Sequence, residues 1–489
     1  MYDRKNFCGG SRGAVFLKSA PLVILLLFFQ LHAGESLIKR QLSVSIDNCL
    51  KNKIYRNVDI GIQLSTIDGG QVLYRRNEKT PYIPASAIKI FISAISLSKF
   101  GPGYRFQTPI MTDGAVLNNT LKGNLYLQGR GDPSLLTGHL EEAARQLKTS
   151  GIDAIEGNIV YDVSFLEEVS TRYPPNARHF YAPPGAITVN SNWLELDLRE
   201  GPPPKLKTIP QTAYARLDYK IKVSRSQNPG RPSMTYREMP WGDQYTINGT
   251  VTEWDKRYKY LCLCVSRPGL FGVTLLKEAC EKAGIKIKGD IVKGKAPVGG
   301  QVLYVIKTPP LVEAVANLNR ESNNVAAELL NENLGAYFDS APGTQEKGLA
   351  VIRDYIVNKL EFPGSSFDFV DACGLSPENR VSADQFTRAL NYFYRELGMV
   401  YVETLARQGV DAHAMNPAPP EGVRVFCKSG TLSASGVNTL VGYIFVDGTK
   451  EVFSFAILCN RRGKGGMTYS GTYTNAFLAA IFKAFNISK

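Results

Sequence analysis

The pattern of apolar and polar residues changes twice along the 489 residues of the chain, and these two changes restrict the possible folds more than any other feature. Before about residue 105 and after about residue 305, long apolar helical patterns alternate with long strand patterns. Between these limits the chain has short strand patterns, turn clusters and proline-rich connectors at 201–204 and 228–232. Such a break is typical of accessory modules inserted into a host domain. We expect a host domain built from residues 34–104 and 296–489, with one module nested in another over 105–295.

The first 33 residues have the composition of a secretory signal peptide. Four basic residues precede the apolar run 21–29, and polar sequence follows Ala33. The run has roughly half the length that a membrane-spanning helix needs. We therefore expect cleavage near Ala33, an exported protein, and no integral membrane segment after cleavage.

The net charge is positive, at +13 for the whole chain. Removal of the signal peptide would lower it to about +10, and a basic exported protein is attracted to anionic polymers. The secretion signal, and the lack of a Lys/Arg run interleaved with aromatic residues, argue against nucleic acid as the partner. Cell wall is the better candidate; a merely well-solvated basic surface is the alternative.

The cysteines of the mature chain form an odd and scattered set, which is no disulfide framework. At most a few disulfides are expected, and several of these cysteines lie in apolar strand patterns where buried free thiols are the simpler interpretation. The seven cysteines are Cys49, Cys262, Cys264, Cys280, Cys373, Cys427 and Cys459.

The host domain begins with a predicted hairpin and a predicted helix. Residues 59–65 and 71–74 alternate between apolar and polar and flank a glycine turn, which indicates a β-hairpin. The apolar segment 84–99 follows, with Pro84 at its start and Gly101 after its end, and this pattern predicts one helix.

Strand patterns return in the second part of the host domain, at 423–428, 442–446 and 452–458, and they predict consecutive antiparallel strands. A helix is expected near 272–283 within the insertion. The last helix carries an apolar stripe at steps of four residues, which indicates a face that packs on the core rather than a membrane anchor. The stripe consists of Tyr473, Phe477, Ile481 and Phe485.

The histidines of the mature chain, His139, His179 and His413, have neither the spacing of a serine-hydrolase triad nor that of a metal site. No metal or cofactor is therefore expected. A serine mechanism without histidine uses a lysine base one helical turn from the serine, because residues three apart share a helix face.

The Ser-x-x-Lys spacing occurs at least three times, at Ser36, Ser86 and Ser96. Ser36 lies at the new N-terminus, and Ser96 with Lys99 ends the predicted helix, where the last turn offers carbonyl groups rather than amide donors. Ser86 with Lys89 opens that helix, where free N–H groups favour negative charge on a substrate oxygen. Ser86 is the serine placed for catalysis.

Two further short motifs follow in order. Ser322-Asn323-Asn324 lies in the largely helical stretch 317–330, while a second Ser-x-Asn at Ser226 falls in a Pro/Gly loop. Lys428-Ser429-Gly430-Thr431 directly follows a strand pattern, where a lysine and a hydroxyl can hold a carboxylate. Each motif alone has little weight, because Ser86 could merely cap a helix and the lysines could be solvated. The three motifs in this order and structural context are together a specific indication of a serine enzyme with a lysine base.

With these motifs the sequence resembles the low-molecular-mass penicillin-binding proteins that carry large insertions, the D-alanyl-D-alanine carboxypeptidases/endopeptidases of the penicillin-binding protein 4 type. The likeness covers essentially the whole mature chain and includes 126–135 (YLQGRGDPSL), 157–162 (GNIVYD), 371–376 (DACGLS), 379–382 (NRVS) and 440–443 (LVGY). The family usually has Lys-Thr-Gly where this chain has Lys428-Ser429-Gly430, and it often has Asp-Gly-Ser-Gly where this chain has DACG.

The resemblance implies an α/β fold, a transpeptidase/β-lactamase-like domain with a five-stranded antiparallel sheet flanked by helices and a nested, β-rich insertion. It implies a periplasmic bacterial enzyme that acts on peptidoglycan peptides and is acylated by β-lactams. Ser86 would be the nucleophile, Lys89 its base, Ser322 a proton relay and Asn324 the residue that orients Lys89. The N–H groups of Ser86 and Thr431 would form an oxyanion hole, and Lys428 with Ser429, next to Gly430, would hold the terminal carboxylate.

Two alternatives remain open from the sequence. A β-lactamase or esterase on the same fold would release its acyl group quickly. A wall-binding structural protein with a dead site would show no burst of acylation by penicillin.

Overall fold

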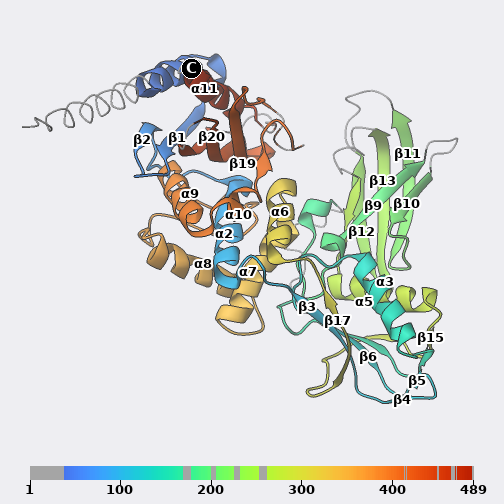
Figure 1. The fold of residues 1–489 in the computed structure, drawn as a ribbon. Coiled ribbons are helices and arrows are strands. Elements are labelled where there is room, and N and C mark those ends of the chain that lie inside the picture. Colours follow the sequence, from blue (N-terminus) through green and yellow to red (C-terminus); the bar gives the residue numbers. More distant parts are fainter. Residues whose placement is uncertain are drawn as a thin grey trace, which may run out of the picture.

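The computed structural model describes residues 38–168, 178–199, 205–224, 232–252, 261–411, 414, 416–448, 451–463, 469 and 471–486 (Figure 1). The predicted signal peptide, Ser36, the second Ser-x-Asn at Ser226, His413 and the connector at 201–204 lie outside these residues. No helix among the described residues is both long enough and apolar enough to cross a membrane.

A six-stranded antiparallel sheet forms the centre of the host domain, in the order β18-β19-β20-β21-β1-β2 (Figure 1). The predicted hairpin and the three predicted C-terminal strands are all present. The resemblance implied five strands, and the structure has six; the strand β18 is only two residues long, too short to give a pattern in the sequence. The strands are β1 (Val58–Thr66), β2 (Val72–Arg76), β18 (Ala406–Arg407), β19 (Val423–Leu432), β20 (Val437–Val446) and β21 (Val452–Arg461).

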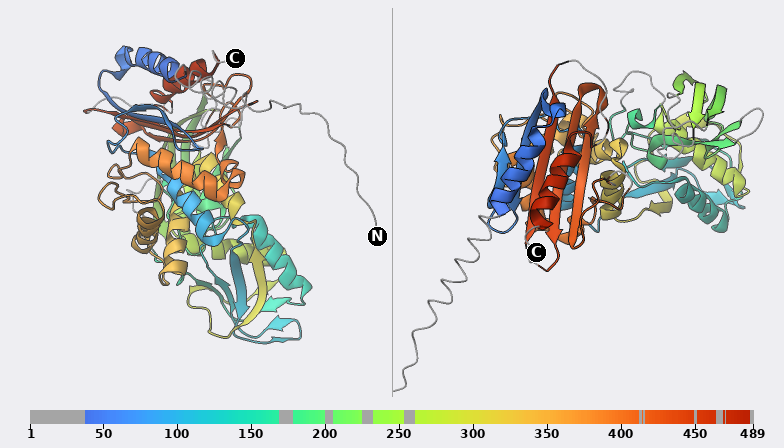
Figure 2. Two further views of the ribbon diagram at one scale, coloured as in Figure 1. Left: turned by 60° about the vertical axis from the view of Figure 1, so that its left-hand side comes forward. Right: turned by 90° about the horizontal axis from the view of Figure 1, so that it is seen from above.

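Helices cover both faces of this sheet (Figure 2). The helix through residues 38–50 and α11 (Thr474–Asn486) lie on one face, and α2 (Lys89–Phe100) and α9 (Ala383–Leu397) lie on the other. Phe477, Ile481 and Phe485 of α11 are buried against the sheet, so the predicted core face is confirmed. The other helices of this domain are η1 (Lys53–Tyr55), η2 (Ala85–Ile88), α6 (Leu311–Glu321), α7 (Asn324–Phe338), α8 (Gln345–Lys359), α10 (Met399–Val402) and η6 (Ser433–Ser435).

The insertion is built on a mixed five-stranded sheet, in the order β16-β8-β6-β3-β17. A smaller sheet, β15-β7-β5-β4, extends it. The predicted end of the insertion at residue 295 stays a prediction. The strand β17 lies after this residue in the chain, and it pairs with β3 of the insertion. The elements are β3 (Gln107–Thr112), β4 (Val116–Leu117), β5 (Thr120–Leu121), β6 (Leu125–Gln128), α3 (Thr137–Thr149), β7 (Ala154–Ile155), β8 (Ile159–Asp162), α5 (Pro268–Lys282), β15 (Lys286–Ile287), β16 (Ile291–Lys293) and β17 (Gln301–Lys307).

A second module is nested in the insertion, between β8 and α5 of the chain (Figure 1). It consists of two three-stranded sheets, β10-β9-β14 and β11-β13-β12. Its elements are η3 (His179–Tyr181), η4 (Asn190–Asn192), β9 (Trp193–Arg199), β10 (Lys205–Ile209), β11 (Ala215–Ser224), β12 (Ser233–Met239), β13 (Gly242–Thr252) and β14 (Cys262–Cys264).

The insertion shares part of its hydrophobic core with the host domain. Val325 and Leu329 of α7 are buried in the same cluster as residues of the insertion, such as Ile187 and Phe271. Helix α7 therefore belongs to both parts, and it carries Asn324 at its first turn.

The seven cysteines of the predicted mature chain are free thiols in the structure, and six of them are buried, which agrees with the expectation of buried thiols in the apolar strands.

Candidate active site

Ser86 lies in a tight turn at the start of the predicted helix. The segment begins as the 3-10 turn η2 and continues as α2, ending at Gly101 as expected. Ala85 has φ of 47°, a left-handed conformation that is uncommon for a residue with a side chain. The loop 371–376 packs on this turn so closely that a Cβ atom on Gly374 would lie 2.1 Å from the Ala85 carbonyl oxygen. The Ser86 turn is thus held in place by the loop 371–376 as well as by the helix α2 that follows it.

Lys89 is fully buried one helical turn from Ser86. Its Nζ lies 3.0 Å from Ser86 Oγ and 2.8 Å from Asn324 Oδ1, and it also contacts the carbonyl oxygen of Cys373. The two carbonyl oxygens can only accept hydrogen bonds. A neutral amine that donates to both keeps its lone pair for the Ser86 hydroxyl proton.

Burial lowers the pKa of Lys89, because a charged ammonium loses its hydration there. The side chains of Cys373, Asp371 and Glu328 act in the opposite direction. Burial has the larger effect, so the neutral form that a general base requires is favoured.

Ser322 and Asn324 lie at a break between two helices. The stretch is largely helical, as predicted, but α6 ends at Ser322, whose φ of 56° is left-handed. The side chain of Asn323 caps α7 by accepting a hydrogen bond from the N–H of Ala326 at 3.1 Å. The break brings Ser322 to Lys428 and Asn324 to Lys89.

Lys428 is the second buried lysine of the site, with 2% of its surface exposed. Its Nζ donates to Ser322 Oγ at 2.9 Å and to the Ser429 carbonyl oxygen at 2.8 Å. Burial lowers the pKa of Lys428 well below its ordinary value, and the nearby charge of Lys89 lowers it further. Ser429 and Thr431, on the same strand β19, are half-buried.

Gly430 allows β19 to lie directly against the Ser86 turn. A Cβ atom on Gly430 would lie 2.3 Å from Thr439 Oγ1 and 2.7 Å from the Pro84 carbonyl oxygen. Thr439, on the next strand β20, donates to that same carbonyl oxygen at 2.7 Å. The close approach places Lys428 and Thr431 next to the nucleophile.

The predicted site residues Ser86, Lys89, Ser322, Asn324 and Lys428 thus meet in one place, with Ser429, Gly430 and Thr431 on the adjoining strand. Sequence reasoning missed Glu328 and Asp371, which shape the loop that supplies the Cys373 carbonyl group. Glu328 Oε1 accepts from the N–H of Ala372 at 3.1 Å and from that of Cys373 at 2.9 Å. Glu328 lies four residues after Asn324 on α7, and this helical spacing is the signal that could have identified it.

Asp371 closes the same loop from the other side. Its Oδ1 accepts from the N–H of Gly374 at 2.7 Å, and its Oδ2 accepts from the N–H of Ser376 at 2.6 Å. The ligand atoms of Glu328, Asp371 and Cys373 lie within 4.8 Å of one another, a grouping with which a metal ion is compatible by distance. Burial, with the two carboxylates, raises the pKa of the Cys373 thiol well above its ordinary value, which disfavours a thiolate ligand.

The competing serine and the described histidines lie elsewhere. Ser96 is completely buried in α2, and Lys99 Nζ lies over the Phe338 ring at 4.8 Å from its centre. His139 accepts a hydrogen bond from the N–H of Leu136 at the start of α3. His179 packs edge-on against Trp193.

The insertion contacts both ends of α7. At the first turn, Asn324 Nδ2 donates to the Phe180 carbonyl oxygen at 3.0 Å, and Asn323 Nδ2 donates to Ser191 Oγ at 2.8 Å. Beyond the last turn, Leu166 forms a parallel bridge with Gly343. Since Asn324 Nδ2 is engaged by the insertion, its Oδ1 is directed to Lys89.

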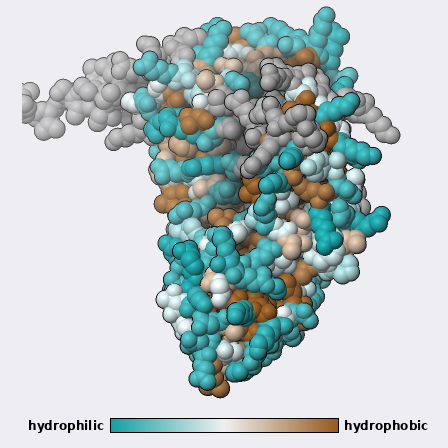
Figure 3. Space-filling model, turned by 90° about the vertical axis from the view of Figure 1, so that its right-hand side faces the viewer, coloured by the Kyte–Doolittle hydropathy of each residue, from teal (hydrophilic) through white to brown (hydrophobic). Residues whose placement is uncertain are grey.

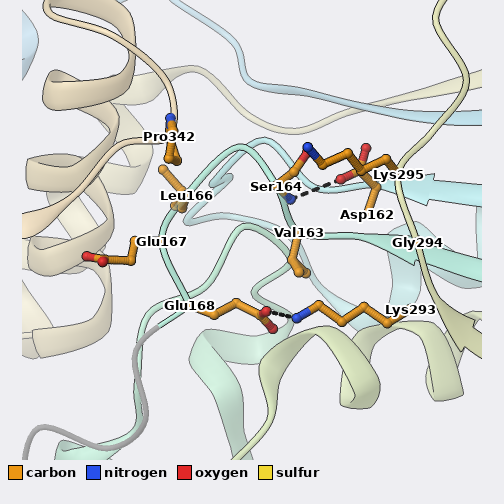
Figure 4. Close-up of a pocket in the computed structure, with 10 residues that line it drawn as sticks. All are labelled: Asp162, Val163, Ser164, Leu166, Glu167, Glu168, Lys293, Gly294, Lys295 and Pro342. Atoms are coloured by element: carbon orange, nitrogen blue, oxygen red, sulfur yellow. Dashed lines mark hydrogen bonds and ion pairs between the residues drawn. The ribbon is translucent and has the colours of Figure 1, made fainter.

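A separate cavity of about 360 Å³ adjoins this second contact (Figure 4). Pro342 of the host domain lies on one side of it, and Lys293 and Lys295 of the insertion lie on the other, with an ion pair between Lys293 and Glu168. None of the predicted site residues lines this cavity.

Comparisons with known proteins agree with this geometry. The chain is 26% identical over 484 residues to a D-alanyl-D-alanine carboxypeptidase of Actinomadura, with 92% of this chain and 87% of the relative covered. It is 23% identical over 407 residues to D-alanyl-D-alanine carboxypeptidase DacB of Haemophilus influenzae, with 81% and 84% covered.

The fold matches a crystal structure of penicillin-binding protein 4 from Haemophilus influenzae. The TM-score is 0.73 at 22% identity, with 89% of this chain and 97% of the solved chain covered. A second crystal structure of that protein, complexed with a β-lactam, matches with a TM-score of 0.67 at 21% identity, covering 88% and 96%. The family profile described as the D-Ala-D-Ala carboxypeptidase 3 (S13) family matches residues 42–468. The chain therefore belongs to this family of serine-type D-Ala-D-Ala carboxypeptidases.

Proposed function

We propose that Ser86 is the nucleophile of a D-alanyl-D-alanine carboxypeptidase/endopeptidase. The observation that carries the proposal is the fully buried amine of Lys89, 3.0 Å from Ser86 Oγ. Ser86 Oγ attacks the carbonyl carbon of the penultimate D-alanine and forms an acyl-enzyme, while the terminal D-alanine leaves as an amine. Water then hydrolyses the ester and regenerates Ser86.

The proton of Ser86 passes to Lys89 during attack. Neutral Lys89 accepts it, and Ser322 relays a proton to the nitrogen of the leaving D-alanine. The hydrogen bond from Lys89 Nζ to Asn324 Oδ1, at 2.8 Å, holds the amine toward Ser86. Lys428 Nζ donates a hydrogen bond to Ser322 Oγ at 2.9 Å. Ser322 can therefore receive a proton from Lys428 when it gives its own proton to the leaving D-alanine.

The N–H groups of Ser86 and Thr431 form the oxyanion hole, and Lys428 with Ser429 binds the terminal carboxylate of the substrate. The pKa of Lys428 is lowered as long as no anion lies beside its amine. An arriving carboxylate favours the charged ammonium, because an opposite charge at short distance raises the pKa of a lysine. Substrate binding and protonation of Lys428 are then coupled.

The substrates are stem peptides of peptidoglycan, and β-lactams acylate Ser86 as mimics of them. The names of the relatives support a substrate that ends in D-Ala-D-Ala and the binding of β-lactams. The signal-peptide composition of the first 33 residues, and the basic charge of the chain, support export to the bacterial periplasm.

Release of D-alanine from a soluble peptide tests this function. The enzyme is incubated with an N-acylated peptide ending in D-Ala-D-Ala and, as a control, with the same peptide ending in L-Ala-L-Ala. We expect release of the terminal alanine from the first peptide alone, and we expect penicillin to abolish this release. Rapid turnover of penicillin without peptide hydrolysis would instead indicate a β-lactamase.

A further inference from the structure

The nested module presents a polar face to solvent on the sheet β11-β13-β12. In the sheet β11-β13-β12, alternate residues point to opposite sides, and the apolar side chains, such as Leu217 and Ile247, pack inward. The side of the molecule on which this module lies is largely hydrophilic, with hydrophobic residues in small groups (Figure 3). The outward side chains that we call the basic face are Arg216, Asp218, Lys220 and Lys222 of β11, Thr246 and Asn248 of β13, and Arg237 of β12.

The basic face is strongly unbalanced in charge. Asp218 is the acidic residue among the outward positions of β11, against three cations on that strand. Of the ion pairs formed among the described residues, none involves Lys220, Lys222 or Arg237. The charge of these side chains is therefore available to a partner.

The cations are spaced by the sheet itself. Arg216 and Arg237 are both in register with Gln244, so they flank it on the same face. Alternate residues such as Lys220 and Lys222 lie about 7 Å apart along the strand. The guanidinium of Arg216 stacks over the Trp241 ring at 4.1 Å, which restricts its movement. Such an array suits a ligand with repeated anionic groups, because single exposed charges bind weakly and several together bind well.

We propose that the basic face binds polymeric peptidoglycan through the carboxylates of its stem peptides. This inference rests on the proposed function, which makes the same polymer the substrate. The stem peptides carry carboxylates at intervals along the glycan, and its sugar hydroxyls suit hydroxyl and amide groups such as those of Thr246 and Asn248. One polymer thus matches both the charged and the uncharged part of the basic face.

The module that bears the basic face is also the module that contacts the active site. Arg178 Nη2 donates to the carbonyl oxygen of Pro232, directly before β12, at 3.1 Å. Two residues later, the Phe180 carbonyl oxygen accepts from Asn324. A polymer held on the basic face is therefore attached to the part of the molecule that packs on the catalytic helix, and its neighbouring stem peptides reach Ser86 at a raised local concentration.

Co-sedimentation with purified sacculi, the intact polymer, tests the proposal. The enzyme is first acylated with labelled penicillin, which stops turnover and separately reports whether Ser86 reacts as the proposed function requires. The triple variant Lys220→Glu, Lys222→Glu and Arg237→Glu should bind sacculi on the order of tenfold more weakly than wild type. Binding by wild type should also fall as salt is added.

The matched control reverses three exposed lysines of the host domain, Lys51→Glu, Lys53→Glu and Lys79→Glu, and has the same net charge. It should bind sacculi nearly as well as wild type, and thermal unfolding checks that both variants fold. Equal losses in both triple variants would overturn the proposal in favour of a general charge effect. Undiminished binding of wild type to glycan strands stripped of stem peptides would also overturn it, because the stem-peptide carboxylates are then gone and only the lactyl carboxylates of the sugars remain.

Discussion

Replacing Lys89 by arginine shows whether Lys89 acts as a general base or only supplies positive charge. A guanidinium stays protonated at every accessible pH, so it cannot accept the Ser86 proton. We expect Lys89→Arg to slow acylation by penicillin as much as Lys89→Ala does, by a factor on the order of 100 to 10,000. The time course of labelling measures both variants. A near-normal rate in the arginine variant would show that Lys89 only supplies charge.

The role given to Lys428 can be tested by combining a variant with a changed substrate. Amidating the C-terminus of the peptide should lower kcat/KM of wild type by a factor on the order of 10 to 100, because a charged hydrogen bond is lost. Lys428→Ala already lacks the partner and should lose much less on amidation. Ser429→Thr keeps the hydroxyl and should be nearly silent, whereas Ser429→Ala should not be. Additive losses from amidation and Lys428→Ala would place the carboxylate elsewhere.

At the scale of elements, the contact between β19 and the Ser86 turn is sensitive to one added methyl group. Gly430→Ala would place a Cβ atom 2.7 Å from the Pro84 carbonyl oxygen and 2.9 Å from the backbone nitrogen of Ala87, so β19 must move away from η2. We expect penicillin acylation to slow by on the order of tenfold or more, since small displacements of reacting groups are costly. Gly138→Ala is the control, because its Cβ meets nothing within 4 Å. Equal acylation rates in both variants would contradict the role of this contact.

Regular elements were predictable from the sequence where their patterns were long. The hairpin of β1 and β2, the strands β19 to β21 and the stripe on α11 follow from apolar periodicity. The break between α6 and α7 at Ser322 could not be predicted, because serine seldom adopts the positive φ that Ser322 has. The contact between Phe180 and Asn324 joins residues 144 positions apart, and no local pattern predicts such a pairing.

For the whole molecule, the buried lysines are expected to destabilise the fold at neutral pH. The folded-state pKa of Lys428 is lowered, so the cost of burial is fully present below that pKa. As pH rises from there toward about 10.4, the unfolded chain holds more protons and stability increases. The melting temperature of Lys428→Met minus that of wild type should therefore fall as pH rises. The exposed control Lys79→Met should show no such trend, and a pH-independent difference for Lys428→Met would contradict the account.

The fold class of the whole chain, α/β with a β-rich insertion, was predicted correctly, while the domain limits drawn from the change of pattern stay a prediction. The sequence motifs placed Ser86, Lys89, Ser322, Asn324 and Lys428 in one site. The supporting carboxylates of Glu328 and Asp371 were missed. Glu328 binds the N–H group of Cys373, 45 positions away, through tertiary packing. Asp371 binds the N–H group of Gly374 within its own loop, and no helical or strand periodicity marks such a loop contact.

The acyl-enzyme on Ser86 can be detected by intact-protein mass spectrometry after treatment with penicillin. Wild type should gain the mass of one penicillin molecule. Ser96→Ala should gain the same mass, because Ser96 is buried within α2 away from the site. Ser86→Ala should gain none. A penicillin adduct that persists in the Ser86→Ala variant would contradict the account.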